Sequence, residues 1–140
     1  MKFLLLIFGL MIVASSKAND TIIDGKEYIA TYFKTGELST LRIKLYGGQD
    51  VLEGPCIAYD IEGNEVYRQN ARRWGGYGNV KFSYYENGGV KTAHYTSHPD
   101  GGIQRTDITT YFDAMGNVIK VLDLSTDGKG DPLLLKGSFP

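Results

Sequence analysis

Apolar and polar residues alternate along several short stretches of this chain. Within residues 39–45, Leu41, Ile43 and Leu45 lie on one face, while Thr40, Arg42 and Lys44 face the other way. Residues 80–84 alternate in the same manner. A period of two is typical of antiparallel strands with one buried and one solvated face. After the first 18 residues no segment of a dozen residues has a helical apolar stripe, so the pattern predicts an all-β chain.

One further stretch has a different pattern. From Val118 to Leu124 the chain is apolar almost throughout rather than alternating. Continuous apolar runs of this length are typical of strands that are covered on both faces. We therefore expect residues 118–124 to form a strand buried on both sides, with the C-terminal tail as one cover.

An aromatic residue followed by a glycine turn and then by Leu or Val occurs four times. The turn glycines are Gly36, Gly63, Gly88 and Gly116, which lie 27, 25 and 28 residues apart. When Tyr111 is aligned with the tyrosines of the earlier copies, the turn of the fourth copy is one residue longer, at Ala114-Met115. A period of this length indicates a repeat architecture, in which small units stack because none buries its own apolar face.

These patterns predict a fold class and its boundaries. We expect an antiparallel meander or short β-solenoid of four β-hairpin repeats over residues 25–128, after a lead-in segment at 19–24. The tail at 129–140 contains three consecutive leucines. Because the end of a solenoid needs a cap, we expect this tail to fold back as one.

The first 18 residues have the features of a secretory signal peptide. Lys2 precedes an apolar stretch that runs to Val13, and Ser16-Lys17-Ala18 fits the small-residue pattern before a cleavage site. The apolar stretch is shorter than the roughly 20 residues that span a bilayer. We therefore expect cleavage after Ala18, a secreted or periplasmic protein, and no transmembrane segment in the mature chain. An uncleaved membrane anchor is the alternative.

Composition restricts the partners. The mature chain would keep 13 basic and 16 acidic side chains, a formal charge of −3. This balance argues against a nucleic-acid partner, which calls for a basic surface. Cys56 is the only cysteine, so disulfides within the chain cannot stabilise it. We expect a buried thiol, with an intermolecular disulfide as the alternative.

The repeats are similar to known repeat families. The segment Tyr84–Tyr95 runs as two aromatic residues, a glycine turn, an aliphatic residue and a lysine, and Tyr32–Leu38 has the same form. These segments resemble the MORN-like, YwqK-type antitoxin-component repeat family, over about residues 25–128. The segment Tyr59–Arg68 is similar to YD-type repeats of large secreted wall proteins. Both resemblances imply hairpin arrays, and a binding or scaffold module in a bacterial secreted or envelope protein.

Sequence motifs for catalysis are weak. His94 and His98 are four residues apart, which in a strand separates them by about 13 Å and is too far for one zinc ion. Cys56 belongs to another repeat, and neither a nucleophile elbow nor a phosphate loop occurs. We therefore expect no catalytic residues, no metal and no cofactor, although a small hydrolase with distant carboxylates is an alternative.

Two groups of residues are candidate binding surfaces. If the hairpins stack in register, the aromatic residues form a ladder that stacks on sugars or peptide side chains, or that only stabilises the sheet. The ladder comprises Tyr32, Phe33, Tyr59, Tyr84, Tyr85, Tyr95, Tyr111 and Phe112. Its candidate binding residues are Tyr32, Tyr59, Tyr84, Tyr85 and Tyr111. The second group is a basic and aromatic cluster that suits an anionic or aromatic ligand, or a solvated strand edge. It comprises Arg72, Arg73, Trp74 and Tyr77.

The expected function is therefore binding rather than catalysis. We expect a non-enzymatic module that binds a protein or a cell-envelope polymer, such as peptidoglycan or polysaccharide, through a face of the sheet. An immunity or antitoxin-like protein that inhibits a single toxin is the alternative from another class.

Overall fold

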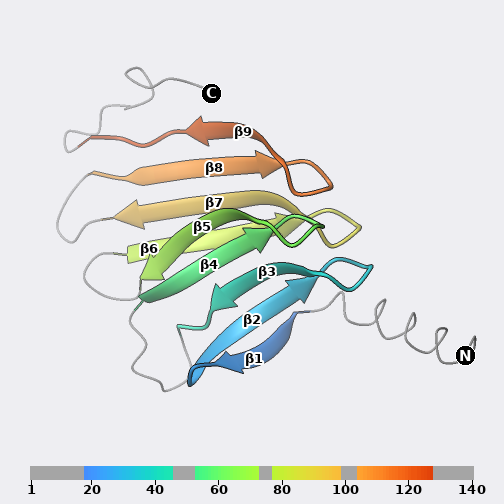
Figure 1. The fold of residues 1–140 in the computed structure, drawn as a ribbon. Helices are drawn as coiled ribbons and strands as arrows, with labels where there is room; N and C mark the ends of the chain where they lie inside the picture. Colours follow the sequence, from blue (N-terminus) through green and yellow to red (C-terminus); the bar gives the residue numbers. More distant parts are fainter. Residues whose placement is uncertain (1–17, 46–52, 73–76, 99–103, 128–140) are drawn as a thin grey trace, which may run out of the picture.

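The computed structural model describes residues 18–45, 53–72, 77–98 and 104–127 and consists of a single antiparallel sheet. Within these residues there is no helix, so the predicted all-β class is confirmed. The nine strands pair in chain order as a meander, and the sheet is not closed (Figure 1). The strands are β1 (Asn19–Ile23), β2 (Lys26–Tyr32), β3 (Leu38–Ile43), β4 (Glu53–Tyr59), β5 (Glu65–Arg72), β6 (Tyr77–Tyr84), β7 (Val90–His98), β8 (Thr106–Phe112) and β9 (Val118–Asp123).

Four hairpins share one turn geometry, and we number them in chain order. Hairpins 1 to 4 are β2–β3, β4–β5, β6–β7 and β8–β9, and their turns gather at one end of the sheet (Figure 1). Each turn closes with two backbone hydrogen bonds at the same relative positions. The fourth turn residue is a glycine with φ between 87° and 101°. This left-handed conformation is the reason for the periodic glycines, because other residues adopt it at a cost.

The fourth turn corrects the alignment of the repeats. In hairpins 1 to 3 the residue before the turn is Tyr32, Tyr59 or Tyr84, but in hairpin 4 it is Phe112. The four turns have equal length, so the prediction of an extra residue in the fourth turn is wrong. Tyr111 lies one position earlier, on β8, and is not the structural counterpart of the other three tyrosines.

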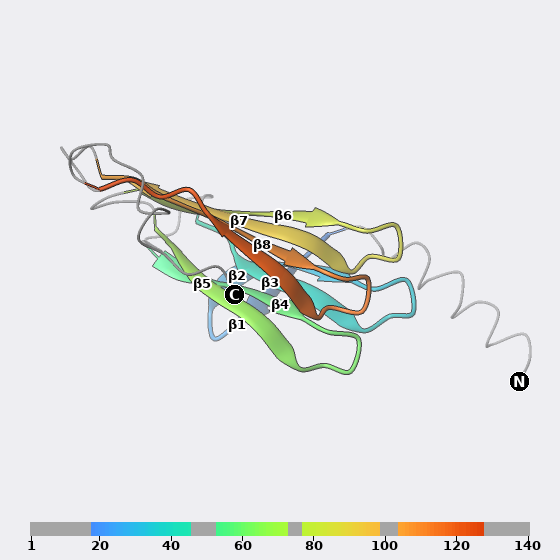
Figure 2. The same ribbon diagram turned by 90° about the horizontal axis from the view of Figure 1, so that it is seen from above.

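The sheet folds over between hairpins 2 and 3. Among the described residues, β5 and β6 share a single paired position, Arg72 with Gly78. Hairpin 2 consequently leaves the plane of β6–β8 and lies on one side of it (Figure 2). The space between these layers holds a core of Ala58, Val90 and Phe112, each of which has no exposed surface.

Because the sheet folds over, hairpin 1 stacks on hairpin 3 and hairpin 2 stacks on hairpin 4, in each case through their turns. The backbone N–H of Lys34 in turn 1 donates to the carbonyl of Asn87 in turn 3, at 2.7 Å. The equivalent N–H of Ile61 in turn 2 donates to the equivalent carbonyl of Met115 in turn 4, at 3.1 Å. Hairpins 1 and 3 therefore form one stacked pair, and hairpins 2 and 4 form a second pair.

The first and last strands occupy the two ends of the meander. The segment expected as a lead-in, residues 19–24, contains the whole of β1, which joins β2 through a tight turn at Asp24-Gly25. At the other end, Val118 is 48% exposed and Ile119 is 62% exposed. Consecutive side chains of a strand point to opposite faces, so both faces of β9 are open to solvent here, and the prediction that residues 118–124 form a strand buried on both faces is wrong. The expected cap at 129–140 and most of the expected signal peptide lie outside the described residues.

Candidate functional site

A cleft lies between hairpins 1 and 3, where the two hairpins separate behind their stacked turns. Close to the turns the hairpins are joined, since the Ser39 hydroxyl donates to the carbonyl of Gly88 at 2.7 Å. One row further from the turns, the Thr40 and Tyr84 hydroxyls are hydrogen-bonded at 2.8 Å. Beyond that bond β2 and β3 no longer touch β6 closely, and two adjoining hollows open between them.

The hollow nearer the turns, which we call the outer hollow, is lined with hydroxyl groups. Its volume is about 170 Å³. The hydroxyls of Thr31 and Thr40 bond each other across β2 and β3, and Tyr84 continues the chain from β6. Ala18, Ile29, Arg42 and Phe82 complete the lining. This hollow therefore combines apolar walls with a row of groups that donate and accept hydrogen bonds.

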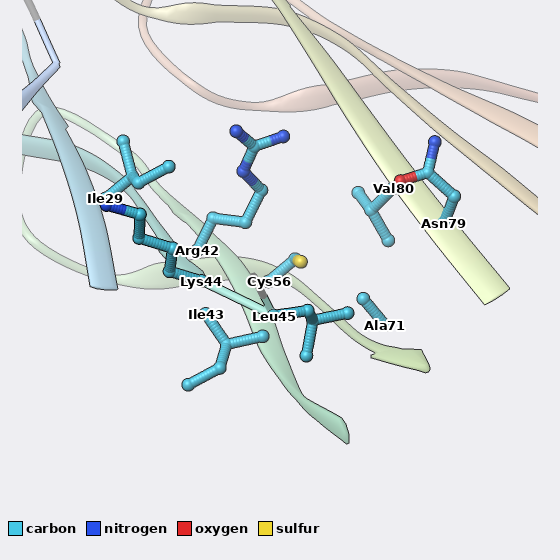
Figure 3. Close-up of a pocket in the computed structure, with 9 residues that line it drawn as sticks. All are labelled: Ile29, Arg42, Ile43, Lys44, Leu45, Cys56, Ala71, Asn79 and Val80. Carbon is cyan, nitrogen blue, oxygen red and sulfur yellow. The ribbon is translucent and has the colours of Figure 1, made fainter. Parts of the chain in front are cut away.

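The second hollow, the inner hollow, is smaller and mostly apolar. Its volume is about 110 Å³ (Figure 3). Arg42 and Cys56 rise side by side from β3 and β4, and Asn79 and Val80 face them from β6 (Figure 3). The other lining residues are Ile29, Ile43, Lys44, Leu45 and Ala71.

Arg42 lies where the two hollows meet, because it lines both of them. Among the described residues its guanidinium has no hydrogen-bond or ion-pair partner. The neighbouring Lys44 differs, since it pairs with Asp20 at 3.2 Å and with Glu27 at 3.6 Å. Its pKa is raised, chiefly by the hydrogen bond to Asp20. Within the described part of the chain, Arg42 is therefore the positive charge of the cleft that no acidic side chain compensates.

Cys56 forms part of the wall of the inner hollow. It is fully buried and free, as expected from the sequence. Burial raises the pKa of its thiol to about 11, against a smaller lowering effect of the nearby Arg42 charge. A thiol with this pKa remains protonated at neutral pH and is a poor nucleophile. Cys56 consequently acts in the cleft as a small apolar side chain.

Of the predicted ladder residues, Tyr84 is the one that lines the cleft. The others are divided among different surroundings, so the five tyrosines do not form a single row. Tyr32 and Tyr59 are half-buried beside their own turns. The Tyr85 hydroxyl donates to the carbonyl of Phe112 at 2.6 Å, which ties turn 3 to hairpin 4. Tyr111 lies under the ammonium of Lys120, 5.4 Å from the ring centre.

The predicted basic and aromatic cluster is described only in part. Arg72 ends β5 and pairs with Glu53 on β4, at 3.3 Å. Arg73 and Trp74 lie outside the described residues. Tyr77 begins β6, and its side chain also lies outside them. Arg72 is thus engaged within hairpin 2 and does not reach the cleft.

The histidines do not form a metal site with each other. His94 on β7 places its Nε2 atom 2.8 Å from a carboxylate oxygen of Asp107 on β8. The same carboxylate accepts a hydrogen bond from Arg105, and its charge is therefore compensated. Within the described ranges, no group of three or more His, Cys, Asp and Glu side chains could hold a metal ion.

Thr31, Thr40 and Arg42 are polar residues of the cleft that were not predicted as site residues from the sequence. Thr40 and Arg42 belong to the polar face of β3, which alternation predicts to be solvated, yet Thr40 is only 1% exposed. The reason is that hairpin 3 folds over this face. Thr31 is the direct partner of Thr40 across the hairpin. The one feature of the sequence that could have indicated a site here is the long, charged Arg42 between apolar neighbours. Its position beside Cys56 follows only from the pairing register of β3 and β4.

Comparisons with known proteins identify no relative. No protein-family model matches the chain, and neither a curated protein nor a solved structure matches it. Along the part of the chain that the structure describes, we find no helix with the length and apolar character needed to cross a membrane.

Proposed function

We propose that this protein is a non-enzymatic hairpin-repeat module of the secreted or periplasmic space. It binds an anionic group of a protein or a cell-envelope polymer in the cleft between hairpins 1 and 3. The observation that carries this proposal is the guanidinium of Arg42, which lies at the junction of the two hollows and has no partner among the residues that the structure describes. The four equivalent turns support the repeat architecture that the MORN-like resemblance implies.

An unpaired arginine in a partly enclosed site favours an anionic ligand. Arginine is rarely withdrawn from water without a partner, because desolvation of its charge costs free energy. A carboxylate or phosphate offers the guanidinium two parallel hydrogen bonds, which are stronger than neutral ones. Since Lys44 is already paired with Asp20 and Glu27, Arg42 is the group that gains most from such a ligand.

Secretion would also change the cleft. Ala18 lines the outer hollow, and we propose that it is the last residue of the cleaved signal. Its removal would widen the mouth of this hollow and place a charged amino group on Asn19, which pairs with Ala30 on β2. Signal cleavage would therefore both expose the site and add to its positive charge.

The test is a comparison of two arginine variants in a pull-down. The protein is exported by its own host with a C-terminal affinity tag, and its N-terminus is determined by mass spectrometry. Bait proteins are wild type, Arg42→Gln and Arg72→Gln, incubated with envelope and medium fractions. Arg72→Gln is the matched control, because that arginine pairs with Glu53 away from the cleft. We expect Arg42→Gln to lose the partner and Arg72→Gln to retain it.

The retained material decides the kind of partner. One protein at equal stoichiometry indicates an immunity-like inhibitor or a complex subunit, whereas peptidoglycan or polysaccharide indicates a polymer-binding module. Thermal unfolding of each variant checks that the fold is intact. If Arg42→Gln, once shown to be folded, retains the same partners as wild type, the cleft is not the binding site and the proposal is wrong.

A further inference from the structure

The charged side chains that line the cleft determine which charged group of a ligand can bind there. Among the described residues that line the two hollows there are two basic side chains, Arg42 and Lys44, and no carboxylate. Lys44 is neutralised by its acidic partners. The cleft therefore matches an anion, and it offers nothing to balance an ammonium group on the same ligand.

The hydroxyl chain in the outer hollow leaves hydrogen-bonding capacity for the ligand. Thr31, Thr40 and Tyr84 contribute three O–H donors, and the bonds between them use two. These two bonds leave one O–H donor and several lone pairs among the three hydroxyls. A group that both donates and accepts, such as a peptide unit, matches this capacity, whereas a hydrocarbon chain would leave it unsatisfied.

The inner hollow limits the size of the apolar part of the ligand. A dry cavity of about 150 Å³ with aliphatic and aromatic walls binds benzene, and the inner hollow has about 110 Å³. It therefore accommodates a branched group of three or four carbons. A long acyl chain would not fit.

We propose that the cleft binds the C-terminal residue of a peptide when that residue has a small branched aliphatic side chain. One such residue carries all three complementary groups around a single α-carbon. Its carboxylate meets Arg42, its peptide N–H meets the hydroxyl chain of Thr31, Thr40 and Tyr84, and its side chain enters the inner hollow. A free amino acid is disfavoured, because its ammonium would find no carboxylate in the cleft. This assignment rests on the proposed function and specifies its ligand.

Fluorescence anisotropy with defined peptides tests the assignment. The probes carry an N-terminal fluorophore, the spacer Gly-Gly-Ser and a last residue that is Val, Leu, Gly or Lys, each as free acid and as amide. We expect the Val or Leu acid to bind best and amidation to weaken it about tenfold or more, as for loss of a charge-assisted hydrogen bond. Free leucine should not compete.

A double-mutant cycle connects the carboxylate to the arginine. In Arg42→Gln amidation should have little further effect, because the group that recognises the carboxylate is gone. Tyr84→Phe removes one member of the hydroxyl chain and should weaken both peptide forms by a similar factor. Arg72→Gln is the control and should bind as wild type does.

The outcomes separate this inference from the proposed function. Equal binding of acid and amide, or no preference for Val and Leu over Gly and Lys, would overturn the inference. The same holds if no peptide binds. In those cases the proposed function stands when the pull-down still depends on Arg42. It fails as well when the pull-down is independent of Arg42.

Discussion

The two stacked pairs of hairpins use the same turn contact but differ in what lies behind it. In the second pair the residue before turn 4 is Phe112, which is fully buried and packs edge-on against Tyr67 of hairpin 2, with ring centres 6.2 Å apart. In the first pair the equivalent residue is Tyr84, which is 40% exposed and bonds Thr40 through its hydroxyl. Equivalent positions thus close the space behind the turns in one pair and leave a cleft there in the other.

The comparison shows how a repeat protein can acquire a site without a new fold. An aromatic ring without a polar atom fills the second pair, and burial raises the pKa of the adjacent Tyr67 to about 12. In the first pair a hydroxyl takes part in a hydrogen-bonded chain, which holds the ring at the edge of a hollow. One side chain at an equivalent position therefore decides between a packed core and an open hollow.

The largest expected effect concerns the closed pair. Phe112→Ala should lower the free energy of unfolding by about 3–5 kcal/mol, because it leaves a cavity in the core. Tyr84→Ala is the matched control in the open pair and should cost less, about 1–2 kcal/mol, since the ring is partly exposed. Urea denaturation measures both values. Equal costs would mean that the two pairs are packed alike and would contradict the comparison.

The second prediction tests whether the turn contacts are equivalent. An added methyl group at Gly88 would collide with the carbonyl oxygen of Tyr32, and at Gly116 it would lie 2.5 Å from the Cα of Asp60. At Gly63 it would meet nothing within 4 Å, although φ is also positive. We expect Gly88→Ala and Gly116→Ala to be less stable than Gly63→Ala by about 1–3 kcal/mol, the usual cost of overpacking.

Gly63→Ala is the control for the second prediction, because it includes the cost of the left-handed backbone, about 1–2 kcal/mol, without the collision. Thermal and urea unfolding of the three variants give the comparison. If all three variants lose the same stability, the stacking of turn 1 on turn 3 and of turn 2 on turn 4 contributes nothing.

A smaller effect on stability is expected from removing the charge of Arg42, in the pair formed by hairpins 1 and 3. Arg42→Met removes a cation with no partner among the described residues. The free energy of unfolding should stay within about 1 kcal/mol of wild type or rise, because no hydrogen bond or ion pair is lost. Ligand binding should be lost in the same variant. A loss of more than about 2 kcal/mol on unfolding would show that Arg42 is structural.

The smallest expected effect is a pH dependence of stability that comes from the even-numbered turns and not from the odd-numbered ones. The even-numbered turns begin with Asp60 or Asp113, and the odd-numbered turns begin with an aromatic residue. At Asp60 partial desolvation would raise the carboxyl pKa, but hydrogen bonds, above all from Asn64, outweigh it and lower the pKa. At Asp113 the hydrogen bond from the Asn117 side chain is the main cause of a lowered pKa.

A lowered folded pKa stabilises the protein above the unfolded value of about 3.9, and this contribution is lost as the pH falls through the folded pKa. Asp60→Asn and Asp113→Asn should therefore lose less stability than wild type between pH 5 and the acid limit. Melting temperatures across this range measure the effect. Glu62→Gln, which removes an exposed carboxylate from turn 2, is the control for the loss of one negative charge.

The strands and turns were predictable because they depend on local rules. Positive φ at Gly36, Gly63, Gly88 and Gly116 demands glycine, and alternation along residues 39–45 and 80–84 follows from the two faces of a strand. The alignment of the fourth repeat was not predictable in this way, since Tyr111 and Phe112 are both aromatic. Hydrogen bonds in the turn, rather than residue type, identify Phe112 as the equivalent position.

The candidate site was predictable only through Tyr84. Alternation along the chain predicts a solvated face for Thr40 and Arg42. This prediction would be correct if the sheet were flat and had a single layer. The sheet departs from its plane where β5 and β6 share a single paired position among the described residues. Hairpin 3 then covers the polar face of hairpin 1.

By itself, the sequence determined the all-β class, the positions of the four glycine turns and the burial of Cys56. These features depend on backbone conformation and on apolar character, which each residue carries wherever the chain folds. Tertiary structure alone decided which hairpins stack, which aromatic residue is buried and where Arg42 lies. Such relations join residues 40 or more positions apart, as in the bond from Thr40 to Tyr84, and no local pattern encodes them.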